Sequence, residues 1–249
     1  MKSVLIAHRG EPLHCPENSL PGFQSALQAG ACFIETDVQI TADGIAVLHH
    51  DPSALKITGS DLPLTTTDYK TLRALPAGYP QRFAGQFQDL HIARLDEFVT
   101  LLQKWPDASA FIEVKEASIA AHGIPAVIAT VLDSLHPVLQ QCVLISFNHE
   151  LLAHARNIYP MPIGWVLHEW STGSKKRATG LEPDYLFCNQ KRLPPATESL
   201  WQGPWKWAVY TVNTASEIPA LLERGIHFVE TDRIRELLAD PALEGWGCD

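Results

Sequence analysis

The sequence predicts an α/β fold, a single (β/α)8 TIM barrel in which eight parallel strands alternate with helices. Short apolar runs alternate with longer segments of helical period, and eight of these runs are strand candidates once one hairpin return is set aside. The length of 249 residues also suits one such barrel. An open, doubly wound sheet is the structural alternative, because a strand count from one sequence can be wrong by one.

The strand candidates share a short apolar core that is bounded by turn or helix signals. An Asp43-Gly44 turn before the apolar run 45–50 predicts a hairpin return after the second strand. Gly30 fits the position just after the end of the first helix, because glycine readily adopts the left-handed conformation needed there. The expected strands are 3–7, 32–40, 109–115, 142–147, 162–168, 184–189, 207–212 and 227–231, and the expected helical segments include 16–30, 95–105, 123–135, 149–158 and 215–225.

The segment 51–90 does not follow the strand–helix alternation. It contains turn and polar residues, one short helix-like piece at 69–75, and a stretch at 76–87 that is rich in glycine, proline and aromatic residues. Long irregular segments in a compact domain usually serve a function or are disordered. Because this segment directly follows His50, we expect a small insertion over the barrel mouth, within one domain that spans residues 1–249.

Composition excludes several classes of partner. A net charge of −9, with one short basic run at 175–177, argues against a nucleic-acid or anionic-membrane surface. Five widely spaced cysteines without a Cys-x-x-Cys pair favour a reducing compartment. The first ten residues contain too short an apolar run for a signal peptide or a membrane anchor. We therefore expect a cytoplasmic protein of unspecified oligomeric state.

Acidic residues at two predicted strands indicate a cation site. Glu35 and Asp37 are two residues apart, as are Glu113 and Lys115, so each pair points to one face of its strand. The exterior face is the weaker alternative, because it packs against helices and favours apolar side chains. Inside the mouth, neighbouring carboxylates repel one another unless a cation neutralises them. We expect Glu35, Asp37 and Glu113 to be metal ligands.

Histidines lie at two of the same strand ends. His8 and Arg9 directly follow the first strand, and His49-His50 end the hairpin return. We favour His50 as the functional residue of that pair, because His49 is one residue out of phase and should face the other way. Imidazoles change charge near neutral pH, so His8 and His50 can supply a general acid and a general base.

The charges of this site favour a phosphodiester substrate. Three carboxylates against Arg9 and Lys115 give a net charge of −1, and one divalent cation changes it to +1. Oxygen ligands favour a hard cation, either Mg²⁺ or Ca²⁺. The sequence has no HExxH motif and none of the glycine-rich phosphate loops found in nucleotide enzymes.

With these residues in place, the chain resembles the glycerophosphodiester phosphodiesterase family over nearly its whole length. The resemblance implies a (β/α)8 barrel with an insertion, and hydrolysis of a small-molecule glycerophosphodiester to glycerol 3-phosphate and an alcohol, with a cyclic phosphate intermediate left open. The matching segments are AHRG (7–10), PENSLPGFQSALQAG (16–30), IETDVQITADGIAVLHHD (34–51), FIEVK (111–115), YTVN (210–213) and ETD (230–232). The resemblance also implies His8 and His50 as the acid–base pair. It implies Glu35, Asp37 and Glu113 as metal ligands. Arg9 and Lys115 would be phosphate contacts, and Glu17 and Asn18 further substrate-site residues.

Several features leave the substrate open. Tyr210 replaces a tryptophan that is frequent in the family, and Phe147, Trp170 and Tyr210 can line the substrate pocket or belong to the core. One alternative is a phospholipase D-like enzyme acting on lysophospholipids, which needs an exposed apolar lip; Tyr79, Phe83 and Phe87 are candidates for it. A non-catalytic binding barrel is a further alternative, although it would be expected to lack a histidine or a metal ligand. A glycosidase is disfavoured by the two histidines beside Arg9 and Lys115.

Overall fold

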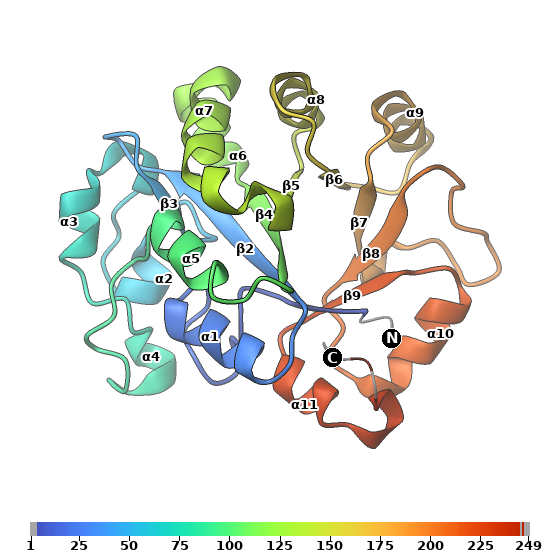
Figure 1. Cartoon of the computed structure of the whole chain (residues 1–249), viewed down its shortest axis with the longest axis horizontal. Coiled ribbons are helices and arrows are strands. Elements are labelled where there is room, and N and C mark those ends of the chain that lie inside the picture. Colours follow the sequence, from blue (N-terminus) through green and yellow to red (C-terminus); the bar gives the residue numbers. More distant parts are fainter. Residues whose placement is uncertain (1–3, 245, 247–249) are drawn as a thin grey trace.

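A closed barrel of eight parallel strands, with helices around the outside, forms the described part of the chain (Figure 1). The computed structural model describes residues 4–244 and residue 246. Strand β1 pairs with both β2 and β9, which closes the barrel and confirms the predicted fold. Ser3, expected at the start of the first strand, and Cys248 lie outside the described residues. The barrel strands are β1 (Leu5–Ala7), β2 (Phe33–Ile40), β4 (Ser109–Val114), β5 (Cys142–Ser146), β6 (Ile163–Val166), β7 (Tyr185–Asn189), β8 (Lys206–Tyr210) and β9 (Phe228–Thr231).

The first of the helices that connect the barrel strands begins at a side-chain cap and ends at a glycine turn. The Oγ of Ser19 accepts a hydrogen bond from the Gly22 N–H at the start of α1, and Gly30 follows its end with a φ of +100°, as predicted. The outer α-helices are α1 (Leu20–Gln28), α5 (Leu95–Leu102), α6 (Glu116–His122), α7 (Ile124–Leu135), α8 (His149–Ile158), α9 (Thr172–Leu181), α10 (Ile218–Glu223) and α11 (Ile234–Leu238). Short 3-10 helices lie at His136–Gln141 (η2), Gln190–Arg192 (η3), Ala215–Glu217 (η4) and Pro241–Leu243 (η5).

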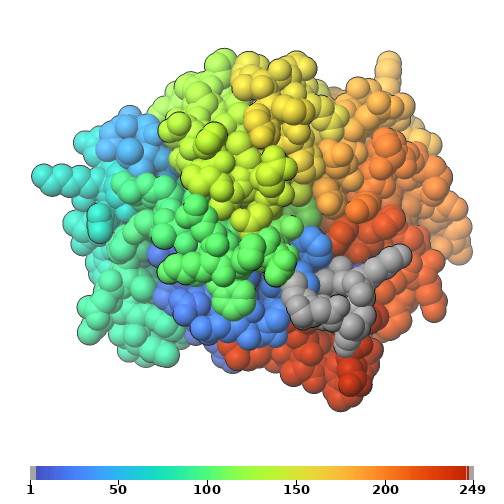
Figure 2. Space-filling view, in the orientation of Figure 1, coloured from blue at the N-terminus to red at the C-terminus, as the bar shows by residue number. Residues whose placement is uncertain are grey.

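The hairpin return and the segment after it form a lobe on one side of the molecule. Strand β3 (Ala46–Leu48) runs antiparallel to β2, as predicted from the Asp43-Gly44 turn. The following segment contains α2 (Leu55–Thr58), η1 (Leu64–Thr66), α3 (Tyr69–Arg73) and α4 (Pro80–Phe83), more regular structure than its composition indicates. Its apolar residues form a small core of their own around Leu64 and Leu72. In the space-filling view the cyan and teal surface of this lobe forms one side of the molecule (Figure 2).

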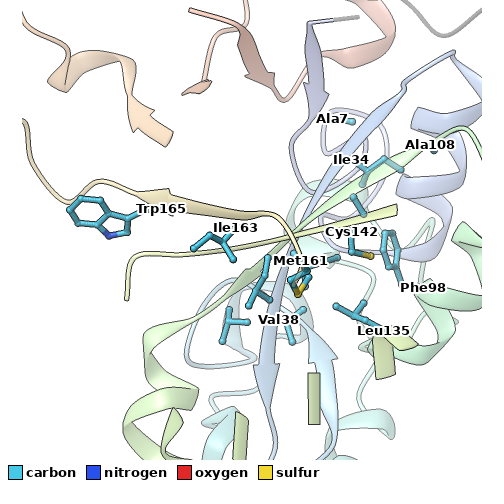
Figure 3. Packing of buried hydrophobic residues seen from close by; sticks show 14 of the residues in the cluster. Ala7, Ile34, Val38, Phe98, Ala108, Leu135, Cys142, Met161, Ile163 and Trp165 are labelled. Atoms are coloured by element: carbon cyan, nitrogen blue, oxygen red, sulfur yellow. The ribbon is translucent and has the colours of Figure 1, made fainter. Parts of the chain in front are cut away.

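Two apolar layers hold the barrel together. The larger one fills the space between strands and outer helices, where Ile34 and Val38 of β2 lie near Phe98 of α5 and Leu135 of α7 (Figure 3). The smaller one fills the barrel itself and is rich in aromatic rings, with Phe111 in edge contact with Phe187 at 5.2 Å. Each fully buried large side chain contributes about 1.5–3 kcal/mol to folding. This packed interior leaves only the ends of the barrel open to carry polar groups.

The cysteines and the helices bear on two earlier expectations. Cys15, Cys142 and Cys188 are free thiols, but Cys32 is disulfide-bonded, which departs from the expectation that a reducing compartment keeps all of them free. No single helix among the described residues has the length and apolar composition needed to cross a membrane. The segments Glu116–His122 and Ile124–Gln141 meet that test only as a pair, and they meet at an angle of 118°.

Candidate active site

Three strands place charged side chains at the carboxyl end of the barrel, and all three share one sequence spacing. On each strand a phenylalanine packs in the barrel interior, and the residues two and four positions later follow it toward the carboxyl end. Because alternate residues share one face, the apolar layer below determines which residues reach the mouth above. These residues are Phe33, Glu35 and Asp37 on β2; Phe111, Glu113 and Lys115 on and just after β4; and Phe228, Glu230 and Asp232 on and just after β9.

A cavity of about 240 Å³ brings most of the predicted site residues together. Trp170 does not line this cavity. It is half-buried and packs against the larger apolar core, with its ring centroid 4.0 Å from that of Trp201. The cavity is lined by His8, Arg9, His50, Glu113, Lys115, Ile145, Phe147, Val166, Phe187, Asn189, Tyr210, Thr211 and Glu230.

Two cationic side chains neutralise one of the buried carboxylates. Asp37 is 1% exposed and lies 3.0 Å from the Arg9 Nε and 3.0 Å from the Lys115 Nζ, which also lies 2.6 Å from Glu113. Burial by itself would raise the pKa of Asp37, but Arg9 and Lys115 outweigh it and the pKa is lowered. Asp37 is therefore an anion at neutral pH.

Glu35 has the opposite electrostatic environment. It is 1% exposed, and burial together with repulsion from Asp37 and Glu230 raises its pKa well above the ordinary value. Its Oε2 accepts a hydrogen bond from the Arg9 backbone N–H at 3.1 Å, whereas its buried Oε1 has no partner among the described residues. A buried acceptor without a partner costs about 1–3 kcal/mol. This orphaned oxygen is the feature of the site that a cation would satisfy.

Within the part of the chain that the structure describes, two sets of side chains have the spacing required to hold such a cation. Carboxylate oxygens of Glu35, Asp37 and Glu113 lie within 4.8 Å of one another, which is the set expected from the sequence. A nitrogen of His8 with oxygens of Glu35 and Glu230 meets the same criterion. The first set offers oxygen atoms only, the ligands that Mg²⁺ and Ca²⁺ prefer.

The two histidines at the cavity are held in the same way. The Nδ1 of His8 lies 2.6 Å from the Asp232 Oδ1, and the Nδ1 of His50 lies 2.7 Å from the Asp51 Oδ1. A carboxylate can only accept a hydrogen bond, so each Nδ1 carries the proton and Nε2 is the nitrogen left for chemistry. His49 is 3% exposed, lies outside this cavity and is bound at Nδ1 by the Asp51 carbonyl.

The surroundings move the pKa values of these two imidazoles in opposite directions. Burial alone would lower the pKa of His8, but Glu230 and the hydrogen bond that His8 donates to Asp232 outweigh it, so the pKa is raised. For His50 burial is the larger influence, reinforced by Arg9 and Lys115, and its pKa is lowered despite Asp37. A pair of titratable groups with divergent pKa values is typical of acid–base sites.

The first loop, between β1 and α1, forms hydrogen bonds with charged side chains of the site. Arg9 and Asn18 have positive φ values of 56° and 54°. This conformation is strained for Arg9 and is adopted more readily by asparagine, and such residues often mark functional sites. Glu17 accepts hydrogen bonds from Arg9 at 3.1 Å and from Lys56 at 2.6 Å. Asn18, 4% exposed, donates to Asp37 at 2.9 Å. The structure thus places Glu17 and Asn18 in contact with protein groups that form the site.

The tripeptide Glu-Thr-Asp occurs twice and is held by an asparagine in the same way each time. The Oδ1 of Asn18 accepts from the Thr36 hydroxyl and the Asp37 N–H, and its Nδ2 donates to the Asp37 carboxylate. Asn213 makes the same three bonds to the second tripeptide, at Thr231 and Asp232. Asn18 orients Asp37 between the positively charged side chains of Arg9 and Lys115. Asn213 orients Asp232 toward His8.

Three residues of this arrangement were given no role from the sequence: Glu230, Asp232 and Asn213. Glu230 is 4% exposed, and burial raises its pKa to about 7 although His8 opposes the shift. The charge count made from the sequence is therefore incomplete, because Glu230 adds a fourth carboxyl group to Glu35, Asp37 and Glu113. The repeated spacing of phenylalanine, acid and charged residue on β9 is the sequence signal that could have identified it.

The model of the glycerophosphoryl diester phosphodiesterase family matches residues 8–236. The chain belongs to this family. As a member it is an enzyme, a phosphoric diester hydrolase, and the resemblance inferred from its motifs is confirmed.

Relatives in this family match the chain along most of its length. A glycerophosphodiester phosphodiesterase of Caldanaerobacter subterraneus is 26% identical, covering 93% of this chain and 95% of the relative. One from Bacillus subtilis is 27% identical, covering 92% and 83%. A phosphodiesterase of Oleispira antarctica, solved with the product sn-glycerol-3-phosphate, has a TM-score of 0.82 at 23% identity, covering 95% of each chain. A glycerophosphodiester phosphodiesterase of Agrobacterium tumefaciens has a TM-score of 0.75 at 23% identity, covering 96% and 100%.

Proposed function

We propose that this enzyme hydrolyses glycerophosphodiesters to glycerol 3-phosphate and an alcohol, with His8 and His50 as the acid–base pair. The observation that carries the proposal is the convergence of both imidazoles, Arg9, Lys115 and Glu113 on one cavity. Cationic groups attract a phosphodiester, and two histidines can supply the proton transfers of its hydrolysis. The product in the Oleispira antarctica phosphodiesterase structure, sn-glycerol-3-phosphate, supports the same chemistry for this chain.

One divalent cation, Mg²⁺ or Ca²⁺, would be held by Glu35, Asp37 and Glu113. The fit rests on the orphaned Glu35 oxygen and on three carboxylates that lie within 4.8 Å of one another. When bound, a cation of this kind supplies a Lewis acid that stabilises negative charge on the phosphoryl oxygens. Arg9 and Lys115 hold Asp37 ionised, so at least one ligand is ready for the cation at neutral pH.

The chain's own residues provide binding, orientation and proton transfer. Arg9 and Lys115 would contact the phosphodiester, while Asp232 and Asp51 keep the Nε2 atoms of the two imidazoles free to exchange protons. One imidazole takes a proton from the attacking oxygen, and the other gives a proton to the leaving alcohol. The attacking group, either water or the glycerol 2-hydroxyl, stays open in this proposal.

The aromatic residues of the cavity suit the carbon atoms of the substrate. Phe147 and Tyr210 line the cavity together with Asn189, and we propose that they contact the glycerol portion. The lysophospholipid alternative finds less support, because Tyr79, Phe83 and Phe87 pack edge-on against one another with ring centroids 6.2 and 5.2 Å apart. We further propose that residues 51–90 are an insertion at the mouth of one barrel domain.

Chelation tests the cation. Glycerophosphodiester hydrolysis should stop in excess EDTA and return when Mg²⁺ or Ca²⁺ is added, measured as release of glycerol 3-phosphate. A panel with different headgroups, assayed with each cation, would identify the preferred metal and alcohol. Undiminished turnover in excess EDTA would remove the cation from the proposal.

Single substitutions test the histidines. His8→Ala and His50→Ala should each lower kcat by about 10²–10⁴-fold, the usual range for an acid–base group. His49→Asn is the matched control, because His49 neighbours His50 in sequence but lies outside the cavity. Near-normal turnover in either alanine variant, or an equal loss in His49→Asn, would contradict the assignment.

A further inference from the structure

A groove adjoins the cavity on the side of the insertion. Its volume is about 550 Å³, and it shares His8 and Arg9 with the cavity described above. The first loop, the insertion and the segment after β9 all contribute to it. The groove is lined by His8, Arg9, Pro12, Leu13, Glu17, Lys56, Arg82, Asn213, Asp232 and Arg233.

The groove is cationic although the whole chain is acidic. Four of its side chains, Arg9, Lys56, Arg82 and Arg233, carry a positive charge, whereas Glu17 and Asp232 carry the negative ones. A surface of this sign on a chain of net charge −9 is a local feature that attracts anions.

Both carboxylates of the groove are already engaged by other groups. Glu17 is paired with Arg9 at 3.1 Å and with Lys56 at 2.6 Å. Asp232 is hydrogen-bonded to His8 at 2.6 Å and to Asn213 at 3.2 Å. Arg82 and Arg233 are exposed, and neither forms an ion pair with any residue of the described ranges. These two guanidinium groups are thus the uncompensated positive charge of the groove.

The chemistry of the substrate decides which portion this charge would meet. Within the proposed function, Arg9 and Lys115 already serve the phosphodiester, and the glycerol portion of every glycerophosphodiester is neutral. A cationic groove gains nothing electrostatically from a neutral glycerol. The aromatic wall of Phe147 and Tyr210, on the other side of the cavity, suits glycerol carbons better. The portion with variable charge is the alcohol.

We propose that this groove binds the alcohol portion of the substrate and that Arg82 and Arg233 select alcohols carrying their own anionic group, a phosphate or a carboxylate. Guanidinium groups bind both anions with paired hydrogen bonds. Because both arginines are exposed, water screens the attraction, so the effect is a preference among substrates and it weakens as salt rises. This inference rests on the proposed function, since it names the substrate class of the same site.

Matched substrate pairs test the proposal. Glycerophosphoinositol and its 4-phosphate differ by one phosphate, and glycerophosphoethanolamine and glycerophosphoserine differ by one carboxylate. The kcat/KM of the charged member should exceed that of its partner in at least one pair, and that pair identifies the anion selected. Arg82→Gln and Arg233→Gln should each reduce the ratio by roughly 3- to 10-fold, as expected for a screened charge-assisted contact.

Arg73→Gln is the control variant, because Arg73 is an exposed arginine of the same insertion that lies outside the groove. It should leave the ratio unchanged. Ratios that are equal in both pairs, or that do not respond to Arg82→Gln and Arg233→Gln, would overturn the subsite while leaving the proposed hydrolysis intact. If none of the four substrates is hydrolysed with Mg²⁺ or Ca²⁺ present, both the subsite and the proposed hydrolysis are overturned.

Discussion

Replacing Asn18 with alanine should weaken both the fold and the proposed cation site, because three hydrogen bonds converge on this one buried amide. Its Oδ1 accepts from the Thr36 hydroxyl at 2.9 Å and from the Asp37 N–H at 3.1 Å, and its Nδ2 donates to Asp37 at 2.9 Å. Thr36 and Asp37 are at most 1% exposed, so water cannot replace the lost partner.

The expected loss of stability follows from these contacts. Two buried donors left without an acceptor cost about 1–3 kcal/mol each. Alanine at a φ of +54° adds about 1–2 kcal/mol, a cost that asparagine and glycine largely avoid. Asn18→Ala should therefore reduce the free energy of unfolding by roughly 3–8 kcal/mol, and Asn18→Gly by about 1–2 kcal/mol less than that.

Asn213 provides a matched comparison for function. It makes the same three bonds to Thr231 and Asp232, but it supports His8 and no proposed cation ligand. Asn18→Ala should raise the Mg²⁺ or Ca²⁺ concentration needed for half-maximal activity by about 10–100-fold, the usual effect of removing a group that orients a ligand. Asn213→Ala should lower kcat without that shift.

Urea unfolding and cation titrations of activity are the measurements. A stability change below about 1 kcal/mol in Asn18→Ala would refute the hydrogen-bond argument. Equal shifts in cation requirement for Asn18→Ala and Asn213→Ala would refute the division of tasks between the two asparagines.

Three further substitutions test other parts of the structure. A carboxyl group whose pKa is raised in the folded state destabilises the protein as pH rises from its ordinary pKa to the raised one. Glu230 has a raised pKa of about 7, so Glu230→Gln should stabilise the chelated protein by roughly 3 kcal/mol at pH 8 and little near pH 4.5. Urea unfolding at the two pH values measures this difference. Arg235→Gln should destabilise the protein by about 1–3 kcal/mol near pH 7, because the wholly buried Glu11 accepts a hydrogen bond from Arg235 at 2.8 Å. The pKa of Glu11 is lowered in the folded protein, so this difference should vanish in acid, where Glu11 is protonated. Gly10→Ala should cost about 2–4 kcal/mol in the same assay, because φ is +87° and a Cβ would lie 2.8 Å from backbone of the first helix; retained stability would contradict this close approach.

The sequence by itself predicted the barrel and several residues of the candidate site. Local patterns with a period of two placed Glu35 and Asp37 on one face, and Glu113 with Lys115 on another, because side chains alternate along any strand. The same alternation separated His50 from His49. These predictions need only neighbouring residues, and the structure places Glu113, Lys115 and His50 at the cavity.

Only the tertiary structure decided what surrounds His8. Asp232 lies 224 residues away along the chain, and the two meet because β9 closes the barrel against β1. The spacing on β9 indicates that Glu230 faces the barrel mouth, but its contact with His8, which helps to raise the pKa of that imidazole, depends on the same closure. The cationic groove has the same origin, since its arginines come from the insertion and from the segment after β9. Burial and distance between remote segments set these energies, and both exist only once the chain has folded.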